Sequence, residues 1–167
     1  MSTATMTADK AVKTVDPLKV FISRVLRAPR RRVFEAWTRA EEMQRWRGPV
    51  GFTVLDASSD ARPGGEHRVT VRGMRPPQSA GEEAQEVTGS SWGRYLEVVP
   101  DELVRFTWLA DWAPGEESVV TVRLKDVEGG TLMEFSHENF ATAESATGHN
   151  NGWNSAFTKL VEFVERD

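Results

Sequence analysis

The clearest pattern in the chain is a helical spacing of apolar residues close to its C-terminus. At positions i, i+3, i+4, i+7, i+8 and i+11 stand Trp153, Ala156, Phe157, Leu160, Val161 and Val164. This spacing predicts a long terminal helix with one strongly apolar stripe. Because such a stripe is stable only when another element covers it, the rest of the chain has to supply a partner.

Segments with the composition and alternation of β-strands precede this helix. They cover residues 18–27, 52–61, 66–73, 92–99, 103–110, 118–127 and 131–138. The last four are joined by short turns, and strands joined in this way pair antiparallel. We therefore expect an α+β fold, in which one curved antiparallel sheet of about six strands covers the terminal helix with its concave face.

Two short helices are predicted between the first and second strand segments. Pro29 suits the first position of one helix, since its missing N–H would have no partner there. Residues 38–41, Thr-Arg-Ala-Glu, have the form of a capping box and predict a second helix that carries Met43 and Trp46 inward. Farther along, the prolines, glycine and glutamates of residues 74–85 predict a loop.

Length and composition narrow the class of protein. At 167 residues the chain suits a single domain, which we expect to span residues 17–167 after a disordered segment, 1–16. It contains no cysteine, which excludes disulfides and thiolate chemistry. No stretch has the length and apolarity of a signal peptide or a membrane span. These features predict a soluble, cytoplasmic protein.

Charge is distributed unevenly along the chain. Residues 1–50 contain 11 Lys+Arg and 5 Asp+Glu, a net charge of +6, whereas residues 51–167 contain 10 and 20, a net charge of −10. The centre of the basic part is an arginine cluster: Arg24, Arg27, Arg30, Arg31 and Arg32. We interpret it as a solvated helix end, with Arg31 and Glu35 paired, in preference to an anion site. The acidic total and the lack of a recognition motif argue against nucleic acid as a partner.

The order of these elements and several local strings resemble the SRPBCC or START-like superfamily. The narrower resemblance is to its branch similar to activator of heat-shock-protein-90 ATPase. The strings that carry it are residues 24–29, 33–38, 48–52, 63–65, 93–98, 103–108 and 130–132, with Trp46, His137 and Gly152-Trp153. The resemblance implies a helix-grip fold: a curved sheet around the long C-terminal helix, two short helices closing one end, and a cavity between helix and sheet.

The chain departs from the family pattern in two places. Family members often have two tryptophans before Gly48-Pro49, but the second position here is Arg47. The loop over residues 74–91 also looks longer than is usual. Since both changes fall where a cavity mouth is expected, the ligand of a family member cannot be transferred to this chain.

The chain contains one string of catalytic form and three histidines, and each has a structural explanation. Residues 89–93 satisfy GxSxG, but a polar loop precedes the serine and a strand follows it, which is the wrong context for a nucleophile elbow. His67, His137 and His149 are too dispersed for a metal site, so we expect neither metal nor cofactor. His137 is interpreted first as a hydrogen-bonded structural residue. For proton transfer it would be the first candidate, ahead of Arg72 or Glu97.

The leading hypothesis is a binding protein that is not an enzyme or is at most weakly catalytic. It would hold a small apolar or aromatic molecule, lipid-like or polyketide-like, between helix and sheet. The candidate ligand-binding residues are Met43, Trp46, Phe52, Val71, Trp92, Phe106, Trp108, Val120, Val122, Met133, Phe135, His137, Trp153, Phe157 and Leu160. An error of one residue in strand parity would move a strand's set to the other face.

Two alternatives stay open. One is a co-chaperone-like interaction domain that stimulates a chaperone ATPase through the arginine cluster. The other is a cyclase or dehydratase that uses a cavity histidine. Gly148 and Gly152, four residues apart at the start of the terminal helix, either let the backbone approach a neighbour or a ligand closely or only weaken that end.

Overall fold

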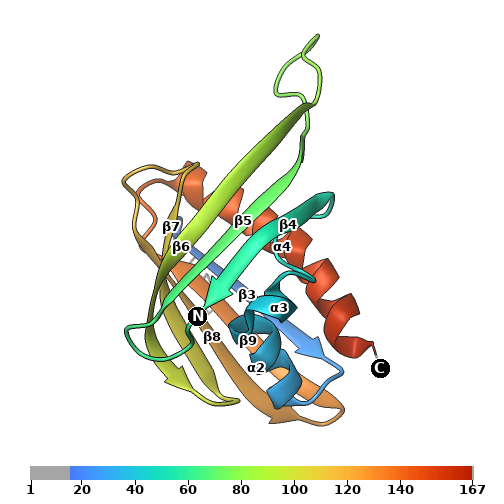
Figure 1. Ribbon diagram of the computed structural model, residues 1–167, viewed down its shortest axis with the longest axis vertical. Helices are drawn as coiled ribbons and strands as arrows, with labels where there is room; N and C mark the ends of the chain where they lie inside the picture. Colours follow the sequence, from blue (N-terminus) through green and yellow to red (C-terminus); the bar gives the residue numbers. More distant parts are fainter. Residues whose placement is uncertain (1–15, 167) are drawn as a thin grey trace, which may run out of the picture.

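The computed structural model describes residues 16–166, so the predicted disordered segment lies outside the described residues except for Asp16. This range contains seven strands and three helices, and Figure 1 shows how they are arranged. In chain order they are β3 (Lys19–Leu26), α2 (Arg30–Thr38), α3 (Ala40–Met43), β4 (Phe52–Ser59), β5 (Glu66–Arg75), β6 (Gln85–Val99), β7 (Leu103–Ala110), β8 (Ser118–Val127), β9 (Gly130–Glu138) and α4 (Ala143–Glu165).

All seven strands form one antiparallel sheet in the order β3-β9-β8-β7-β6-β5-β4. The predicted α+β class and the helix-grip arrangement are confirmed, and each of the seven predicted segments forms a strand, one more than the expected total of about six. The pairing shifts register at Val54/Asp56 and at Tyr95/Glu97. Irregularities of this kind bend a strand, which helps the sheet to curve around α4.

Strand β5 ends at Arg75, close to its predicted end, but β6 begins at Gln85, well before its predicted start at residue 92. The two strands form the long hairpin that projects from the body of the molecule (Figure 1). The loop predicted from composition over residues 74–85 is confirmed for residues 76–84, whereas the longer loop expected up to residue 91 is wrong, because residues 85–91 belong to β6. Gly73 pairs with Val87 and Arg75 with Gln85, so only residues 76–84 connect the two strands. Cross-strand pairing decides this region, and the prolines that suggested a loop mark only the turn.

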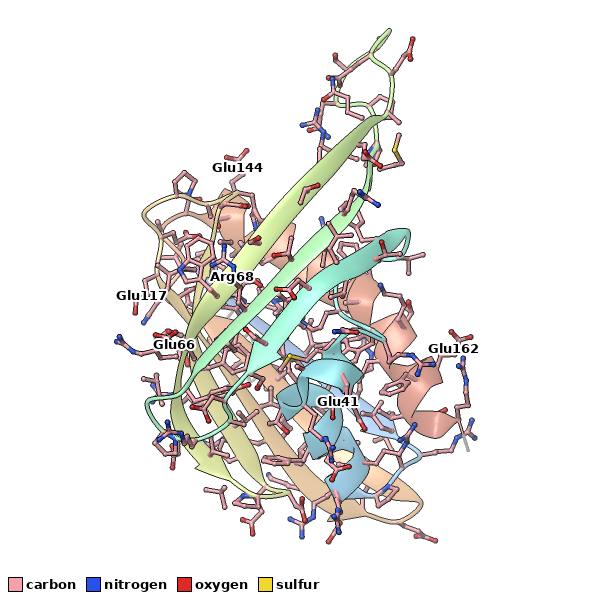
Figure 2. The ribbon with its side chains drawn as sticks, viewed as in Figure 1. Glu41, Glu66, Arg68, Glu117, Glu144 and Glu162 are labelled. Atoms are coloured by element: carbon pink, nitrogen blue, oxygen red, sulfur yellow. The ribbon has the colours of Figure 1, made fainter. Side chains whose placement is uncertain are left out.

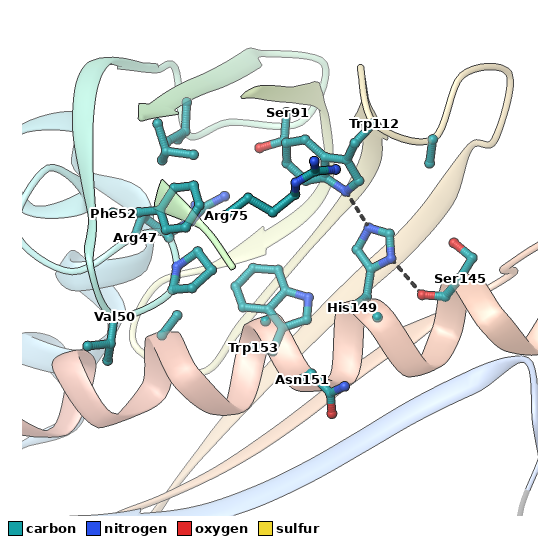
Figure 3. A pocket seen from close by; sticks show the side chains of 18 of the residues that line it. Arg47, Val50, Phe52, Arg75, Ser91, Trp112, Ser145, His149, Asn151 and Trp153 are labelled. Carbon is teal, nitrogen blue, oxygen red and sulfur yellow. Dashed lines mark hydrogen bonds between the residues drawn. The ribbon is translucent and has the colours of Figure 1, made fainter. Parts of the chain in front are cut away.

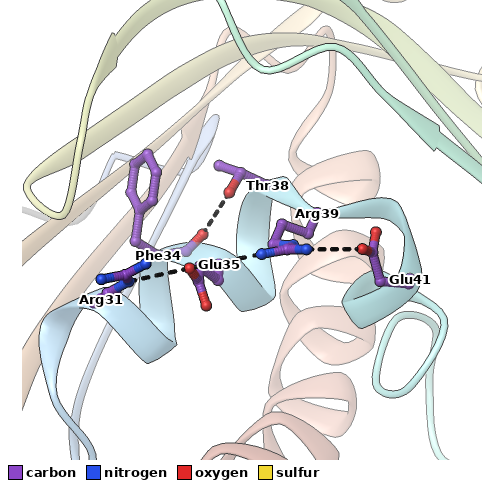
Figure 4. A network of polar contacts seen from close by, with 6 residues as sticks. All are labelled: Arg31, Phe34, Glu35, Thr38, Arg39 and Glu41. Carbon is purple, nitrogen blue, oxygen red and sulfur yellow. Dashed lines mark hydrogen bonds and ion pairs between the residues drawn. The ribbon is translucent and has the colours of Figure 1, made fainter.

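The two short helices are present, but the predicted capping box is not. Thr38 is the last residue of α2, and its hydroxyl donates to the carbonyl of Phe34 at 2.9 Å. Arg39 is the N-cap of α3, but its side chain forms no capping hydrogen bond with the helix backbone, and its guanidinium pairs instead with the Glu41 carboxylate (Figure 4). Pro29 is likewise the N-cap of α2 and not its first helical residue.

The arginine cluster is paired within the chain. Arg31 forms the predicted ion pair with Glu35, seen in Figure 4. The other four contact α4 or a neighbouring strand. Arg24 donates to Asn154, Arg27 pairs with Glu165, Arg30 pairs with Asp126, and Arg32 donates to the carbonyls of Phe163 and Val164. Figure 2 shows acidic side chains on the outside of two helices, Glu41 on α3 and Glu144 and Glu162 on α4.

The core lies between α2, α4 and the concave face of the sheet, and Trp37 is at its centre. Its ring centroid lies within 6.4 Å of those of five other rings, in Trp46, Phe106, Phe135, Trp153 and Phe157. The Trp46 indole donates to the carbonyl of Ala36, and the Trp37 indole contacts the Met133 sulfur. Contacts between rings at these distances stabilise beyond area burial, so this end of the interior is closely packed.

Candidate ligand cavity

A cavity of about 960 Å³ opens beside this core, between the N-terminal half of α4, strands β4 and β5, and the segment 47–50. Figure 3 shows Ser145, His149 and Trp153 rising from α4 into it. Its lining residues are Arg47, Gly48, Pro49, Val50, Phe52, Val69, Val71, Met74, Arg75, Pro76, Gln78, Ser91, Trp108, Trp112, Ala113, Ser145, Gly148, His149, Asn151, Gly152, Trp153 and Ala156. This volume is at the upper end of the range for small-molecule sites.

Small residues on α4 keep the cavity open. Gly148, Gly152 and Ala156 recur four residues apart, and side chains at this spacing share one helix face. A Cβ built at Gly148 or Gly152 would meet nothing within 4 Å. The interpretation that these glycines let a neighbouring backbone approach closely is therefore wrong. Close approach of a ligand stays a prediction. The two glycines leave room at the cavity floor.

The Gly148→Ala variant is expected to unfold with a free energy about 0.5–1 kcal/mol higher than wild type. Alanine loses less backbone entropy than glycine in a helix, and the added methyl group enters open space. Urea denaturation followed by tryptophan fluorescence measures the difference. Gly115→Ala is the matched control with the opposite sign, because Gly115 has φ +80°. Destabilisation by Gly148→Ala would show that the space is not open.

Two aromatic residues of the cavity wall pack against glycines of the sheet. The Phe52 ring lies over Gly73, where a Cβ would come within 2.5 Å of the ring. The Trp112 ring lies in the same way over Gly89, at 2.8 Å from the position of a Cβ. Any larger residue at either position would displace the ring. The pattern of glycine opposite an aromatic residue thus fixes the placement of two lining side chains.

His149 connects the two tryptophans at one end of the cavity. Its Nε2 accepts hydrogen bonds from the indole N–H groups of Trp108, at 3.3 Å, and Trp112, at 3.2 Å. Its Nδ1 lies 2.9 Å from the carbonyl oxygen of Ser145 and must donate to it. These three bonds fit only the neutral ring with hydrogen on Nδ1, and burial lowers the pKa of His149 in agreement. Figure 3 shows the bonds to Trp112 and Ser145.

His137 lies behind the cavity wall, fully buried. Its Nδ1 accepts from the Trp153 indole at 3.0 Å, so its Nε2 carries the hydrogen and donates to the Ser118 hydroxyl at 2.7 Å. Burial holds the pKa of His137 well below its ordinary value, with the neighbouring His149 as a smaller cause. A neutral ring with both nitrogens engaged inside the core orients Trp153 and has no free position for a proton transfer.

Arg47 is the charged residue of the cavity interior. It is 4% exposed, and its guanidinium lies over the rings of Trp46, Trp108 and Trp153 at 5.7, 5.6 and 5.5 Å from their centroids. Lys159 of α4 donates to the carbonyls of Arg47 and Phe52 and fixes this segment on the helix. Burial lowers the pKa of the Arg47 guanidinium to about 10, with the Tyr95 hydroxyl as a smaller, opposing cause.

A second, smaller hollow of about 360 Å³ lies near Arg68, Trp92 and Glu117, the latter labelled with Arg68 in Figure 2. The Arg68 guanidinium covers the Trp92 ring at 5.1 Å. Trp92 pairs with Arg68 and Leu109 across the sheet and does not border the main cavity. This hollow has no apolar wall comparable with that of the main cavity.

The sequence profile of a family described as activator of Hsp90 ATPase homolog 1-like protein matches residues 27–165. The chain belongs to this family. The resemblance noted from the sequence is thereby confirmed.

Solved structures of other family-like proteins share the fold. A protein from Chromobacterium violaceum is 28% identical, with a TM-score of 0.71 over 89% of this chain and 99% of its own. An AHSA1 protein from Silicibacter pomeroyi is 20% identical, with a TM-score of 0.71 over 86% of this chain and 95% of its own. A Rhodobacter sphaeroides protein is 20% identical, with a TM-score of 0.72 over 92% and 96%. Comparison with curated proteins gives no match.

Four of the candidate ligand-binding residues predicted from the sequence border the main cavity: Phe52, Val71, Trp108 and Trp153. Most others lie in the packed interior, away from the cavity lining: Met43, Trp46, Phe106, Val120, Val122, Met133, Phe135, His137, Phe157 and Leu160. Trp92 borders the second hollow. Their roles in binding stay predictions, but the structure brings only the first four together around open space.

The sequence analysis nominated none of the cavity's polar residues for binding, among them Arg47, Arg75, Ser145 and His149. A signal existed for the first, because Arg47 interrupts the pattern of tryptophans before Gly48-Pro49. No signal pointed to the contact between His149 and its indole donors, which come from β7 and the turn after it. Residues 89–93 lie inside β6, so the GxSxG string forms no nucleophile elbow.

Neither a metal site nor a membrane-spanning helix occurs within residues 16–166. No group of three or more acidic or histidine side chains is arranged to hold a metal ion. None of the described helices is long and apolar enough to cross a membrane.

Proposed function

We propose that this protein binds a small, largely apolar or aromatic molecule in the cavity between α4 and the sheet. The observation that supports this function is the cavity itself, about 960 Å³ with walls formed by Phe52, Trp108, Trp153 and three valines. A concave pocket of this size with aromatic walls and a minority of polar groups is typical of ligand sites. The cytoplasmic location stays a prediction.

Binding can be tested with N-phenyl-1-naphthylamine, an uncharged aromatic molecule that fluoresces in apolar surroundings. We expect saturable binding with a dissociation constant on the order of 1–100 μM, a range typical of a moderate apolar contact. Amide chemical shifts should change mainly along residues 69–75 and 148–153, which border the cavity. Native mass spectrometry of freshly purified protein would show directly whether a natural ligand is retained.

The Gly152→Leu variant distinguishes binding in the cavity from binding on the outer surface of α4. Leucine at this position projects into open space, improves helix propensity and should weaken binding at least tenfold without loss of stability. Thr158→Leu adds the same side chain to an exposed position of α4 and should leave binding unchanged. Absence of saturable binding by wild type, or equal binding by Gly152→Leu, would contradict the proposal.

The other two hypotheses receive less support from the described residues. Docking to a chaperone through the arginine cluster would compete with the pairs that Arg27, Arg30 and Arg31 already form. A cavity histidine for catalysis would be His149, whose ring nitrogens are both engaged. Ligand binding is therefore placed first, and stimulation of a chaperone ATPase remains the alternative suggested by the family description.

A further inference from the structure

We infer that the ligand of this cavity carries an anionic group, a carboxylate in the simplest case, and that Arg47 binds it. The inference rests on the proposed function and adds the charge of the ligand, which an apolar cavity alone does not determine.

The first observation is that a buried guanidinium faces the cavity without a counterion. Arg47 is 4% exposed and borders the cavity, and no ion pair or side-chain hydrogen bond of its guanidinium occurs within residues 16–166. Buried charges in proteins are normally paired, because desolvation of an isolated charge is costly. The five N–H donors of an arginine in such a position fit the two oxygens of a carboxylate.

The second observation is the sign of the charges around the cavity. Its charged lining residues are Arg47 and Arg75, and none of its lining residues is acidic, although the whole chain has a net charge of −4. Arg75 is itself paired with Glu82 and donates to Gln85. Arg47 is therefore the cation of the lining for which no ion pair occurs within residues 16–166. Two nearby carboxylates are already engaged, since Asp111 accepts from the Ser90 amide and Glu116 from the Ser145 hydroxyl.

The third observation is that the surroundings keep Arg47 charged and in place. Its neighbour His67 is held neutral, since burial, the Arg47 charge and a smaller opposing bond to Thr107 set the pKa of His67 at about 4. The three indole rings around the guanidinium provide cation–π contacts that hold its plane. The same rings form an apolar wall beside the charge. An apolar or aromatic body with one anionic end matches this combination.

A matched pair of compounds tests the charge of the ligand in wild-type protein. At pH 7.5, 1-naphthylacetate and its uncharged amide, 1-naphthylacetamide, would each compete with N-phenyl-1-naphthylamine. A buried hydrogen bond to a charged group contributes enough that we expect the acid to bind about tenfold more tightly or better. Equal competition by the two compounds, or none by the acid, would overturn the inference while leaving binding of N-phenyl-1-naphthylamine intact.

The Arg47→Met variant assigns the preference to this residue. We expect the acid to lose about tenfold or more in affinity, the amide and N-phenyl-1-naphthylamine to change less than about threefold, and the preference for the acid to disappear. Arg47→Lys keeps the charge and should retain part of the preference. Arg45→Met removes an exposed arginine two residues away and should change nothing.

The outcomes separate the two proposals. Failure of wild type to bind N-phenyl-1-naphthylamine would refute ligand binding in the cavity. Normal binding of that molecule, with an acid preference that survives Arg47→Met, would refute the role of Arg47 alone. Near-ultraviolet circular dichroism confirms that each variant is folded, and the comparison of acid with amide in wild type needs no variant.

Discussion

Lowering the pH from 6.5 to 4 is expected to reduce the free energy of unfolding by about 3 kcal/mol or more. The chain contains three histidines, and burial lowers the pKa of each in the folded state. For His67 the value is about 4, compared with about 6.5 in an unfolded chain. A difference of this size corresponds to about 3 kcal/mol for that group alone.

The direction follows from proton uptake. Between pH 6.5 and 4 the unfolded chain binds protons at its histidines, whereas the folded chain leaves His67 neutral. Unfolding therefore takes up protons and becomes easier as the pH falls. The contribution is complete above pH 6.5 and is lost as the pH falls to about 4. His137 and His149 add to it with the same sign, because both are bound as neutral rings that accept indole N–H groups.

Urea denaturation at several pH values between 7.5 and 4 measures this dependence. The His67→Gln variant is the informative comparison, since its side-chain amide can still donate to the Thr107 carbonyl, which lies 3.0 Å from His67 Nε2. We expect the stability lost between pH 7.5 and 4 to be smaller in this variant by about 2–3 kcal/mol. The same loss in both proteins would show that His67 is not the group responsible.

The fold could be predicted from the sequence because its signals are periodic. Alternation places Phe106 and Trp108 of β7 on the concave side, with Val120 and Val122 of β8 beside them, and these four residues are at most 6% exposed. The spacing of apolar residues from Trp153 to Val164 likewise predicts the buried face of α4. Period and parity are local properties, so a sequence reveals them without knowledge of tertiary contacts.

The cavity could not be located in the same way. Phe135 and Phe52 are both apolar and both face inward, but Phe135 touches other side chains and Phe52 borders open space. Whether an inward-facing side chain meets other side chains or open space depends on how closely α4 approaches its strand. That approach depends in turn on small residues, such as Gly148 and Gly152, that leave room. The sequence marks the glycines, but it does not say whether another backbone or a void lies beside them.

Hairpin length and the capping box failed for a related reason. Each was predicted from the preferences of a few residues, and in each a hydrogen bond outside those residues accompanies the different outcome. The β5–β6 pairing continues to Arg75 and Gln85 despite the glycine and polar residues nearby. Thr38 ends a helix where its sequence suggested a beginning, because its hydroxyl already bonds to Phe34. Side-chain hydrogen bonds of threonine serve either position.

Replacement of Arg47 by methionine is expected to raise the free energy of unfolding by about 1–3 kcal/mol. The lowered pKa of Arg47, about 10 against an ordinary 12.5, corresponds to about 3 kcal/mol of lost stability for the charged form. Cation–π contacts with three tryptophans offset part of this cost. Methionine has a similar length, contacts aromatic rings well and needs no counterion, so it removes the cost while keeping most of the packing.

The measurement is urea denaturation without ligand, with Arg45→Met as the control for an exposed arginine, which should change stability by less than about 0.5 kcal/mol. Destabilisation by Arg47→Met would show that the guanidinium stabilises the free protein, and it would then need no anion to balance its charge. If stability rises while affinity for 1-naphthylacetate falls, the two effects have one cause. A residue that destabilises the empty protein and strengthens binding is retained for its ligand, because the anion supplies the partner that the folded chain lacks.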